Sequence, residues 1–97
     1  MNAWEAYEKL RKEGKLIARA EEGIEWAELY AVPDDCFNVI PLVVLVLYVD
    51  GRMEFYTREN MPVEELYNFI SSFFLYNPNR INKDGWDGLD YYLLNLS

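Results

Sequence analysis

The most apolar stretch of the chain runs from residue 40 to residue 49 and is followed by Asp50-Gly51. Eight of its ten residues are aliphatic and none is charged, and its many β-branched residues favour a strand over a buried helix. It is too short for a transmembrane helix, which takes about 20 apolar residues. Asp-Gly is a two-residue hairpin signal, and residues 52–58 alternate as a return strand does. The pattern predicts a central strand apolar on both faces and a partner that buries one face.

Two amphipathic segments are predicted to be helices. The first runs from an Asn2 cap to about Glu13, and Gly14 is expected to end it as a C′ glycine. The second covers residues 62–76, with Pro62 in its first turn and acidic residues near its positive end. The apolar stripe of the first helix consists of Ala3, Trp4, Ala6, Tyr7 and Leu10. The aromatic surface of the second is wider than one sheet face requires.

Two more strands are predicted before the central one, over residues 15–20 and 24–32, joined by a turn at 21–23. In the second of these strands Trp26 and Tyr30 share one face. Glu28 falls on the same face, which indicates either a sheet edge or a functional position. A helix over residues 22–30 is the competing interpretation. After a polar turn region, the chain is expected to end in either a short helix beginning near Trp86 or an edge strand through 91–96.

These elements predict one α+β domain over residues 1–97. It would contain a four-stranded, mainly antiparallel sheet with an N-terminal helix and a long helix packed on it. The central strand needs apolar cover on both faces, so either the C-terminal segment or a second copy of the chain is expected to supply it. The surplus aromatic surface of the second helix favours a homodimer over a monomer.

The chain is acidic, with a formal net charge of −8. The excess lies after residue 22, because the first 22 residues carry five basic and five acidic side chains. An acidic surface argues against direct nucleic-acid binding and against binding to an anionic membrane. It suits a protein partner with a basic surface, although solubility alone would also explain it.

The residue content excludes several kinds of chemistry. The chain has no histidine and one cysteine, which removes histidine-dependent nucleophiles, histidine zinc sites and iron–sulfur clusters. It also lacks the glycine motifs that bind nucleotide phosphates. Asp84, Asp87 and Asp90 have a spacing that suggests a hard-cation site, but Trp86 interrupts the alternate ligands of a calcium loop. We therefore expect a protein that is not an enzyme and has no cofactor and no metal.

Other candidate groups have simpler interpretations. The carboxylates between Glu25 and Glu65 are expected to be solvated, because acid–base pairs need a cleft that so small a domain rarely has. The acidic neighbours of Cys36 disfavour a reactive thiolate, so this residue is expected to anchor a loop. A small anion could stack and pair with Arg19, Trp26, Tyr30 and Arg58, but core packing of the rings is preferred.

The single cysteine allows no internal disulfide, and residues 1–14 lack the apolar core of a secretory signal. We therefore expect a cytoplasmic protein, located in the host cytoplasm if it is viral.

A set of residues in the N-terminal half is shared with one family: Asn2, Glu5-Ala6, Leu10, Gly14-Lys15, Ala18-Arg19, Tyr30-Ala31-Val32-Pro33 and Asp50-Gly51. This half resembles small phage anti-defence proteins of the Thoeris sponge type, in which a helix ending in Gly-Lys leads into a strand ending in Ala-Arg. The resemblance implies an oligomeric α+β protein that sequesters a cyclic ADP-ribose-like signal, and a relative is an anti-CRISPR protein. The family's Gly-Trp-Asn step is replaced here by residues 20–24, so no ligand residue is carried over.

The leading hypothesis is a non-enzymatic acidic inhibitor, phage- or virus-encoded and anti-CRISPR-like, that binds and blocks a nucleic-acid-handling host protein. Its carboxylates would stand where that protein expects phosphates. The predicted partner-binding residues, with Trp86 as an aromatic anchor, are Asp34, Asp35, Glu59, Glu64, Glu65, Asp84, Trp86 and Asp87. The alternatives are a sponge for a cyclic nucleotide immune signal and an immunity protein that neutralises a basic nuclease toxin.

Overall fold

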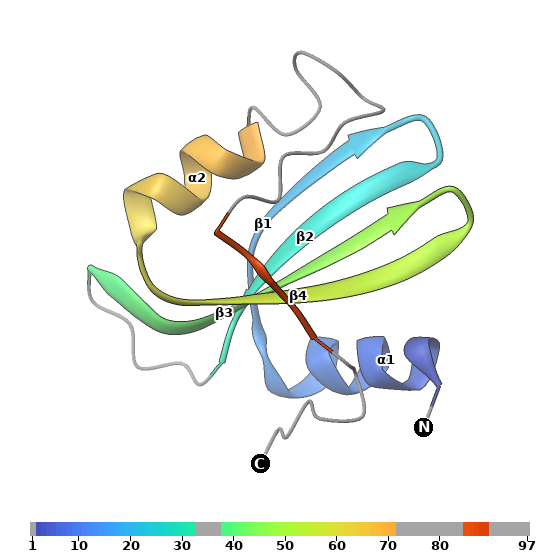
Figure 1. Ribbon diagram of the computed structural model, residues 1–97, viewed down its shortest axis with the longest axis horizontal. Coiled ribbons are helices and arrows are strands. Elements are labelled where there is room, and N and C mark those ends of the chain that lie inside the picture. Colours follow the sequence, from blue (N-terminus) through green and yellow to red (C-terminus); the bar gives the residue numbers. More distant parts are fainter. Residues whose placement is uncertain (1, 33–37, 72–84, 90–97) are drawn as a thin grey trace.

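A computed structural model describes residues 2–32, 38–71 and 85–89 as a sheet with one helix on each face (Figure 1). The elements are α1 (Ala3–Glu13), β1 (Lys15–Glu22), β2 (Glu25–Ala31), β3 (Val39–Val49), β4 (Arg52–Pro62), α2 (Val63–Ser71) and β5 (Asp87–Gly88). The sheet order is β1-β2-β3-β4-β5, and all neighbouring strands are antiparallel. The α+β class is confirmed. The sheet has five strands instead of four because the two residues of β5 pair with β4.

The two hairpin turns follow from local backbone preferences. Asp50 and Gly51 have φ angles of 56° and 72°, as a two-residue turn with positive φ at both positions requires, so the predicted hairpin is confirmed. β1 extends to Glu22, which moves the first turn from residues 21–23 to Gly23-Ile24. Gly23 has a φ of 63°, a conformation that glycine adopts without strain.

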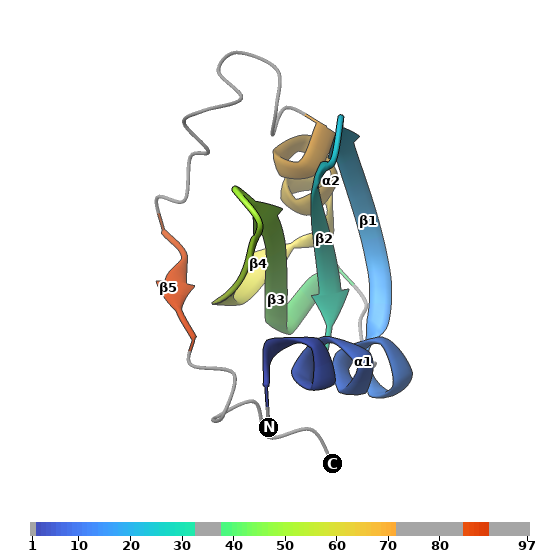
Figure 2. The same cartoon turned by 90° about the vertical axis from the view of Figure 1, so that its right-hand side faces the viewer.

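The two helices cover opposite faces of the sheet. Figure 2 shows α1 below the strands and α2 at their upper part, partly behind β2. Leu10 of α1 belongs to a buried cluster with Val44 and Val46 of β3. Leu66 of α2 belongs to a second cluster with Leu45 of the same strand. One chain therefore covers both faces of its central strand: α1 lies on one face and α2 on the other, and the C-terminal segment adds Leu89 to the first cluster and Trp86 to the second. A second copy is not needed for this cover.

The structure confirms the predicted N-cap of α1 but gives Gly14 a role different from the predicted C′ glycine. The Asn2 side chain accepts a 2.9 Å hydrogen bond from the Glu5 amide, as an N-cap does. Gly14 has φ −89° and ψ 172°, so it is extended and not left-handed as C′ glycines commonly are. A Cβ at this position would lie only 2.8 Å from the Leu10 carbonyl oxygen. Glycine is therefore required here by close approach.

The second helix and the C-terminal region differ from the predicted boundaries. Pro62 ends β4, and α2 begins one residue later. Residues 72–76 and 91–96, which complete the predicted helix and edge strand, lie outside the described residues. Asp87–Gly88 pairs with β4, so a helix cannot begin at Trp86. Over the ranges that the structure describes, neither helix has the length and apolarity needed to cross a bilayer.

Candidate functional site

The predicted partner-binding residues are only partly brought together. Asp34, Asp35 and Asp84 lie outside the described residues, as do Cys36 and Asp90. The exposed members of the set are Glu59, Glu64 and Glu65 near the junction of β4 and α2, and Asp87 on β5. Trp86 is only 7% exposed and packs on Phe69 with ring centroids 5.3 Å apart. In the described structure, Trp86 is therefore a core residue and not an exposed anchor.

A buried carboxylate lies between the sheet and α1. Glu28 is 4% exposed, and its Oε1 accepts hydrogen bonds from the hydroxyls of Tyr7 at 2.6 Å and Tyr30 at 3.0 Å. Its other carboxylate oxygen, Oε2, forms an ion pair with the Arg19 guanidinium. β2 is flanked by β1 and β3, so Glu28 does not mark a sheet edge. Its position among aromatic residues was the sequence signal for this network of side chains from α1, β1 and β2.

Arg19 links this network to the surface. Its Nε donates to Glu21 Oε1 at 2.6 Å, and its guanidinium carbon lies 5.0 Å from the centre of the Trp26 ring. Burial lowers the pKa of Arg19, but its hydrogen bonds to Glu21 and Glu28 outweigh burial and raise that pKa above the usual value. The guanidinium therefore stays charged and fastens β1 to β2. This arrangement stabilises the fold and leaves Glu28 fully engaged.

The two tyrosine hydroxyls should make the protein sensitive to alkali. Burial, together with the Glu28 carboxylate, raises the pKa of Tyr7 and of Tyr30 above the usual value of 10.0. In the unfolded chain both ionise near pH 10, while in the folded protein they stay protonated. Their contribution to stability is therefore complete below pH 10 and is lost as the pH rises above it.

We expect absorbance titration near 295 nm to show at least two of the eight tyrosines ionising only as the protein unfolds. Replacing both residues by phenylalanine should remove this step and flatten the loss of stability above pH 10. Replacing exposed Tyr67 should leave it unchanged. Normal ionisation of all tyrosines in the folded protein would contradict the geometry.

An exposed aromatic ring, stacked against two half-buried ones, lies near the amino end of α1. Trp4 is 54% exposed, although the sequence pattern placed it on the buried stripe. Its ring lies 5.9 Å from that of Tyr48, which stacks on Trp26 at 5.7 Å with an angle of 18° between the ring planes. Trp4 caps this stack because it sits in the first turn of α1, above the ends of β2 and β3. No signal in the sequence distinguished it from the buried stripe residues.

Carboxylates surround the same end of the molecule. The Asp50 amide donates to Glu25 Oε2 at 3.2 Å, which ties the β3–β4 turn to the start of β2. Figure 1 shows both hairpin turns and the amino end of α1 at one end of the structure. We call this end of the molecule the aromatic–acidic surface and define it as Trp4, Glu5, Glu25, Trp26, Tyr48 and Asp50. The rings lie on the α1 face of the sheet, whereas Glu25 alternates with Trp26 and reaches the same end from the α2 face. It combines stacking surface with negative charge, which suits a cationic group.

The proposed anion-binding set is not assembled. Arg19 and Trp26 are in contact, but Tyr30 is buried and Arg58 lies on β4, two strands from Trp26. Nor do the described residues contain a group of three or more side chains placed to hold a metal ion.

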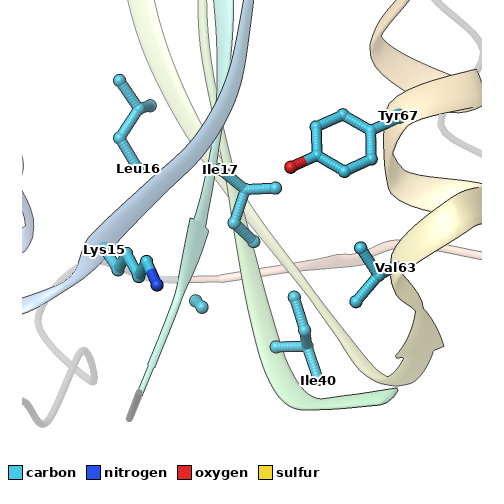
Figure 3. Close-up of a pocket in the computed structure, with 7 residues that line it drawn as sticks. Lys15, Leu16, Ile17, Ile40, Val63 and Tyr67 are labelled. Atoms are coloured by element: carbon cyan, nitrogen blue, oxygen red, sulfur yellow. The ribbon is translucent and has the colours of Figure 1, made fainter. Parts of the chain in front are cut away.

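An apolar pocket lies between β1 and α2 (Figure 3). Its volume is about 220 Å³, and its lining consists of Lys15, Leu16, Ile17, Ala31, Ile40, Val63 and Tyr67. At its rim, Leu16 is 48% and Tyr67 is 52% exposed. The pocket depends on how α2 packs against the sheet, so residue spacing could not predict it.

Comparisons with known proteins give no relative for this arrangement. No protein-family model, curated protein or solved structure matches the chain. The resemblance to phage anti-defence proteins therefore stays a prediction.

Proposed function

We propose that this protein is a non-enzymatic inhibitor that docks on the basic surface of a nucleic-acid-handling protein and blocks it. The aromatic–acidic surface would make the contact. The observation that carries this proposal is the exposed ring of Trp4, which continues the Tyr48–Trp26 stack at the same end of the molecule as Glu25 and Asp50. The phage or virus origin remains part of the proposal.

The charge distribution supports a basic partner. The described residues include thirteen acidic and seven basic side chains. Four of the basic ones, Lys9, Arg11, Lys12 and Lys15, lie on α1 after its first turn or at the start of β1. Arg19 is already paired with two carboxylates. Arg52 lies directly after the Asp50-Gly51 turn, but the carboxylates near the two hairpin turns outnumber the basic groups there. The resulting negative potential would speed association with a basic protein.

The combination of rings and carboxylates suits a surface that normally binds nucleic acid. Proteins that bind single strands use basic grooves together with aromatic platforms for base stacking. The exposed Trp4 ring near carboxylates would offer such a groove the same two features as a base near phosphates. An arginine of the partner could stack on an indole ring and pair with a carboxylate at the same time.

The other group of exposed carboxylates provides a comparison. Glu59, Glu64 and Glu65 lie near the opposite end of β4 from the Asp50-Gly51 turn, roughly 24 Å away at the usual rise of a strand. The tryptophan expected to anchor that region, Trp86, is buried. Both groups carry negative charge. Neutralising each group separately can therefore distinguish a specific contact from general electrostatic attraction.

The test compares two triple variants with equal charge change. One combines Glu5→Gln, Glu25→Gln and Asp50→Asn, and the other combines Glu59→Gln, Glu64→Gln and Glu65→Gln. At position 25, glutamine keeps a side-chain oxygen that can accept the hydrogen bond from the residue 50 amide. At position 50, asparagine tolerates the positive φ of the turn. Immobilised wild-type protein is used to capture basic proteins from a lysate of the organism in which it acts, and the affinity of the captured protein is then measured for each variant.

We expect the first triple variant to bind about tenfold or more weakly, a loss of about 1.4 kcal/mol or more, and the second to bind nearly as wild type. The wild-type protein should also displace nucleic acid from the captured protein. Equal losses of affinity in both variants would mean that binding depends on general charge attraction and not on a specific contact. Undiminished nucleic-acid binding by the captured protein would overturn the inhibitory function.

A further inference from the structure

The outer edge of β1 offers backbone groups for pairing. Among the described residues, β1 pairs with β2 and with no other strand. The outward N–H and C=O groups of an edge strand are a template for adding a further strand. A register shift between Leu16 and Ala18 marks a bulge at Ile17, which leaves Ala18–Glu22 as the regular part of this edge.

The sequence of this regular part is self-complementary. It reads Ala-Arg-Ala-Glu-Glu, with a small residue, Ala20, at its centre. In antiparallel pairing with an identical strand about Ala20, Arg19 stands opposite the partner subunit's Glu21. The same pair forms a second time by symmetry. Arg19 already pairs with Glu21 and Glu28 of its own chain, so the partner's carboxylate would join an existing charge cluster. Opposite charges facing each other across two strands stabilise the pairing, and a two-fold axis makes the contact the same patch on both copies.

We propose that β1 pairs antiparallel with the β1 strand of a second copy, with the two-fold axis at Ala20. The resulting dimer contains one continuous sheet across both chains. The proposal goes beyond the inhibitory function and does not depend on it. The dimer expected from the sequence would have covered one face of the central strand. Because α1 already covers that face, the β1–β1 dimer has a different basis.

Exposed apolar side chains at both ends of the edge support this register. Ile24 is 84% exposed in the β1–β2 turn, a position where such a residue gains nothing from the fold of its own chain. The pairing brings the partner subunit's turn beside the bulge, next to Leu16 and Tyr67. Both residues line the apolar pocket; Figure 3 shows Tyr67 directed from α2 toward β1, whereas the Leu16 side chain lies on the other side of β1. The partner's Ile24 stands opposite Leu16 in this register and would cover it, and the converse contact would follow by symmetry.

The interface leaves the rings of Trp4 and Tyr48 open, whereas Glu25 of the aromatic–acidic surface lies next to Ile24. Trp4 and Tyr48 belong to α1 and β3, away from the outer edge of β1. A dimer would therefore present this surface twice, which strengthens binding to any partner that can engage both copies.

Cysteine substitution at the two-fold axis tests the register. In a Cys36→Ser background, Ala20→Cys places two thiols opposite each other in the dimer. Directly opposed Cα atoms lie about 4.5–5.5 Å apart, within the range for a disulfide. Ala18→Cys is the matched control, because it faces the partner's Glu22 and not its own equivalent. Under mild oxidation we expect Ala20→Cys to give a disulfide-linked dimer in high yield, whereas Ala18→Cys should form little disulfide although it still pairs as a dimer.

Analytical ultracentrifugation provides a second measurement that needs no new thiol. We expect the wild-type protein to sediment as a dimer. The Ile24→Asp variant should have a dimer dissociation constant at least tenfold higher. Val39→Asp, which changes an exposed residue of β3, should leave the dimer unchanged. A wild-type monomer at about 100 μM, or equal cross-linking of the two cysteine variants, would overturn the proposal. Neither result would bear on the charge-neutralisation test of function.

Discussion

Replacing Glu28 by alanine should lower the free energy of unfolding by about 3 kcal/mol. The change removes the acceptor of the Tyr7 and Tyr30 hydroxyls, and each buried donor left without a partner costs about 1–3 kcal/mol. It also removes one of the two carboxylates that pair with Arg19. Arg19 keeps Glu21 and remains partly exposed, so its loss is smaller than that of a fully buried charge.

Glu22→Ala is the matched control, because it removes an exposed carboxylate from the neighbouring strand. We expect it to change the free energy of unfolding by no more than about 0.5 kcal/mol. Urea denaturation followed by tryptophan fluorescence measures both variants. A Glu28→Ala protein as stable as the control would mean that the network is not formed in solution.

Replacing Leu10 by alanine should lower the free energy of unfolding by about 3 kcal/mol, within the range for large-to-small changes in a core. Leu10 is fully buried and belongs to the cluster that joins α1 to Val44, Val46 and Phe55. The cavity would lie under α1, the element that covers the second face of the central strand. The loss should therefore appear as weaker docking of the whole helix.

Val39→Ala provides the comparison for this variant, because Val39 lies on the same sheet but is 44% exposed. We expect a loss below about 1 kcal/mol for it. Hydrogen exchange of the α1 amides would show whether the helix opens separately in Leu10→Ala. If the Leu10 variant lost no more than the control, α1 would not be the cover that the structure indicates.

The inhibitory function and the dimer make separate demands on the chain. The first requires the rings and carboxylates near the hairpin turns, and the second requires the outer edge of β1. Their variants share no residue, so either proposal can fail while the other stands. If both hold, the protein presents two identical acidic surfaces on one extended sheet.

The sequence by itself determined the elements whose formation depends on neighbouring residues. Asp50-Gly51 specifies its hairpin because both residues accept positive φ. The Asn2 cap acts within one helical turn. Alternation along β2 correctly separated Trp26 and Tyr30 from Ala27 and Leu29, because successive side chains of any strand point to opposite faces.

Only the tertiary structure decided how these elements meet. Glu28 was recognisable as an unusual carboxylate, but its partners Tyr7 and Arg19 lie 21 and 9 residues away. The exposure of Trp4 and the burial of Trp86 depend on which part of the sheet each indole reaches. Periodicity reports the side of an element that a residue occupies, whereas burial depends on what packs against that side. The buried network and the aromatic–acidic surface therefore arise from the docking of α1 on the sheet.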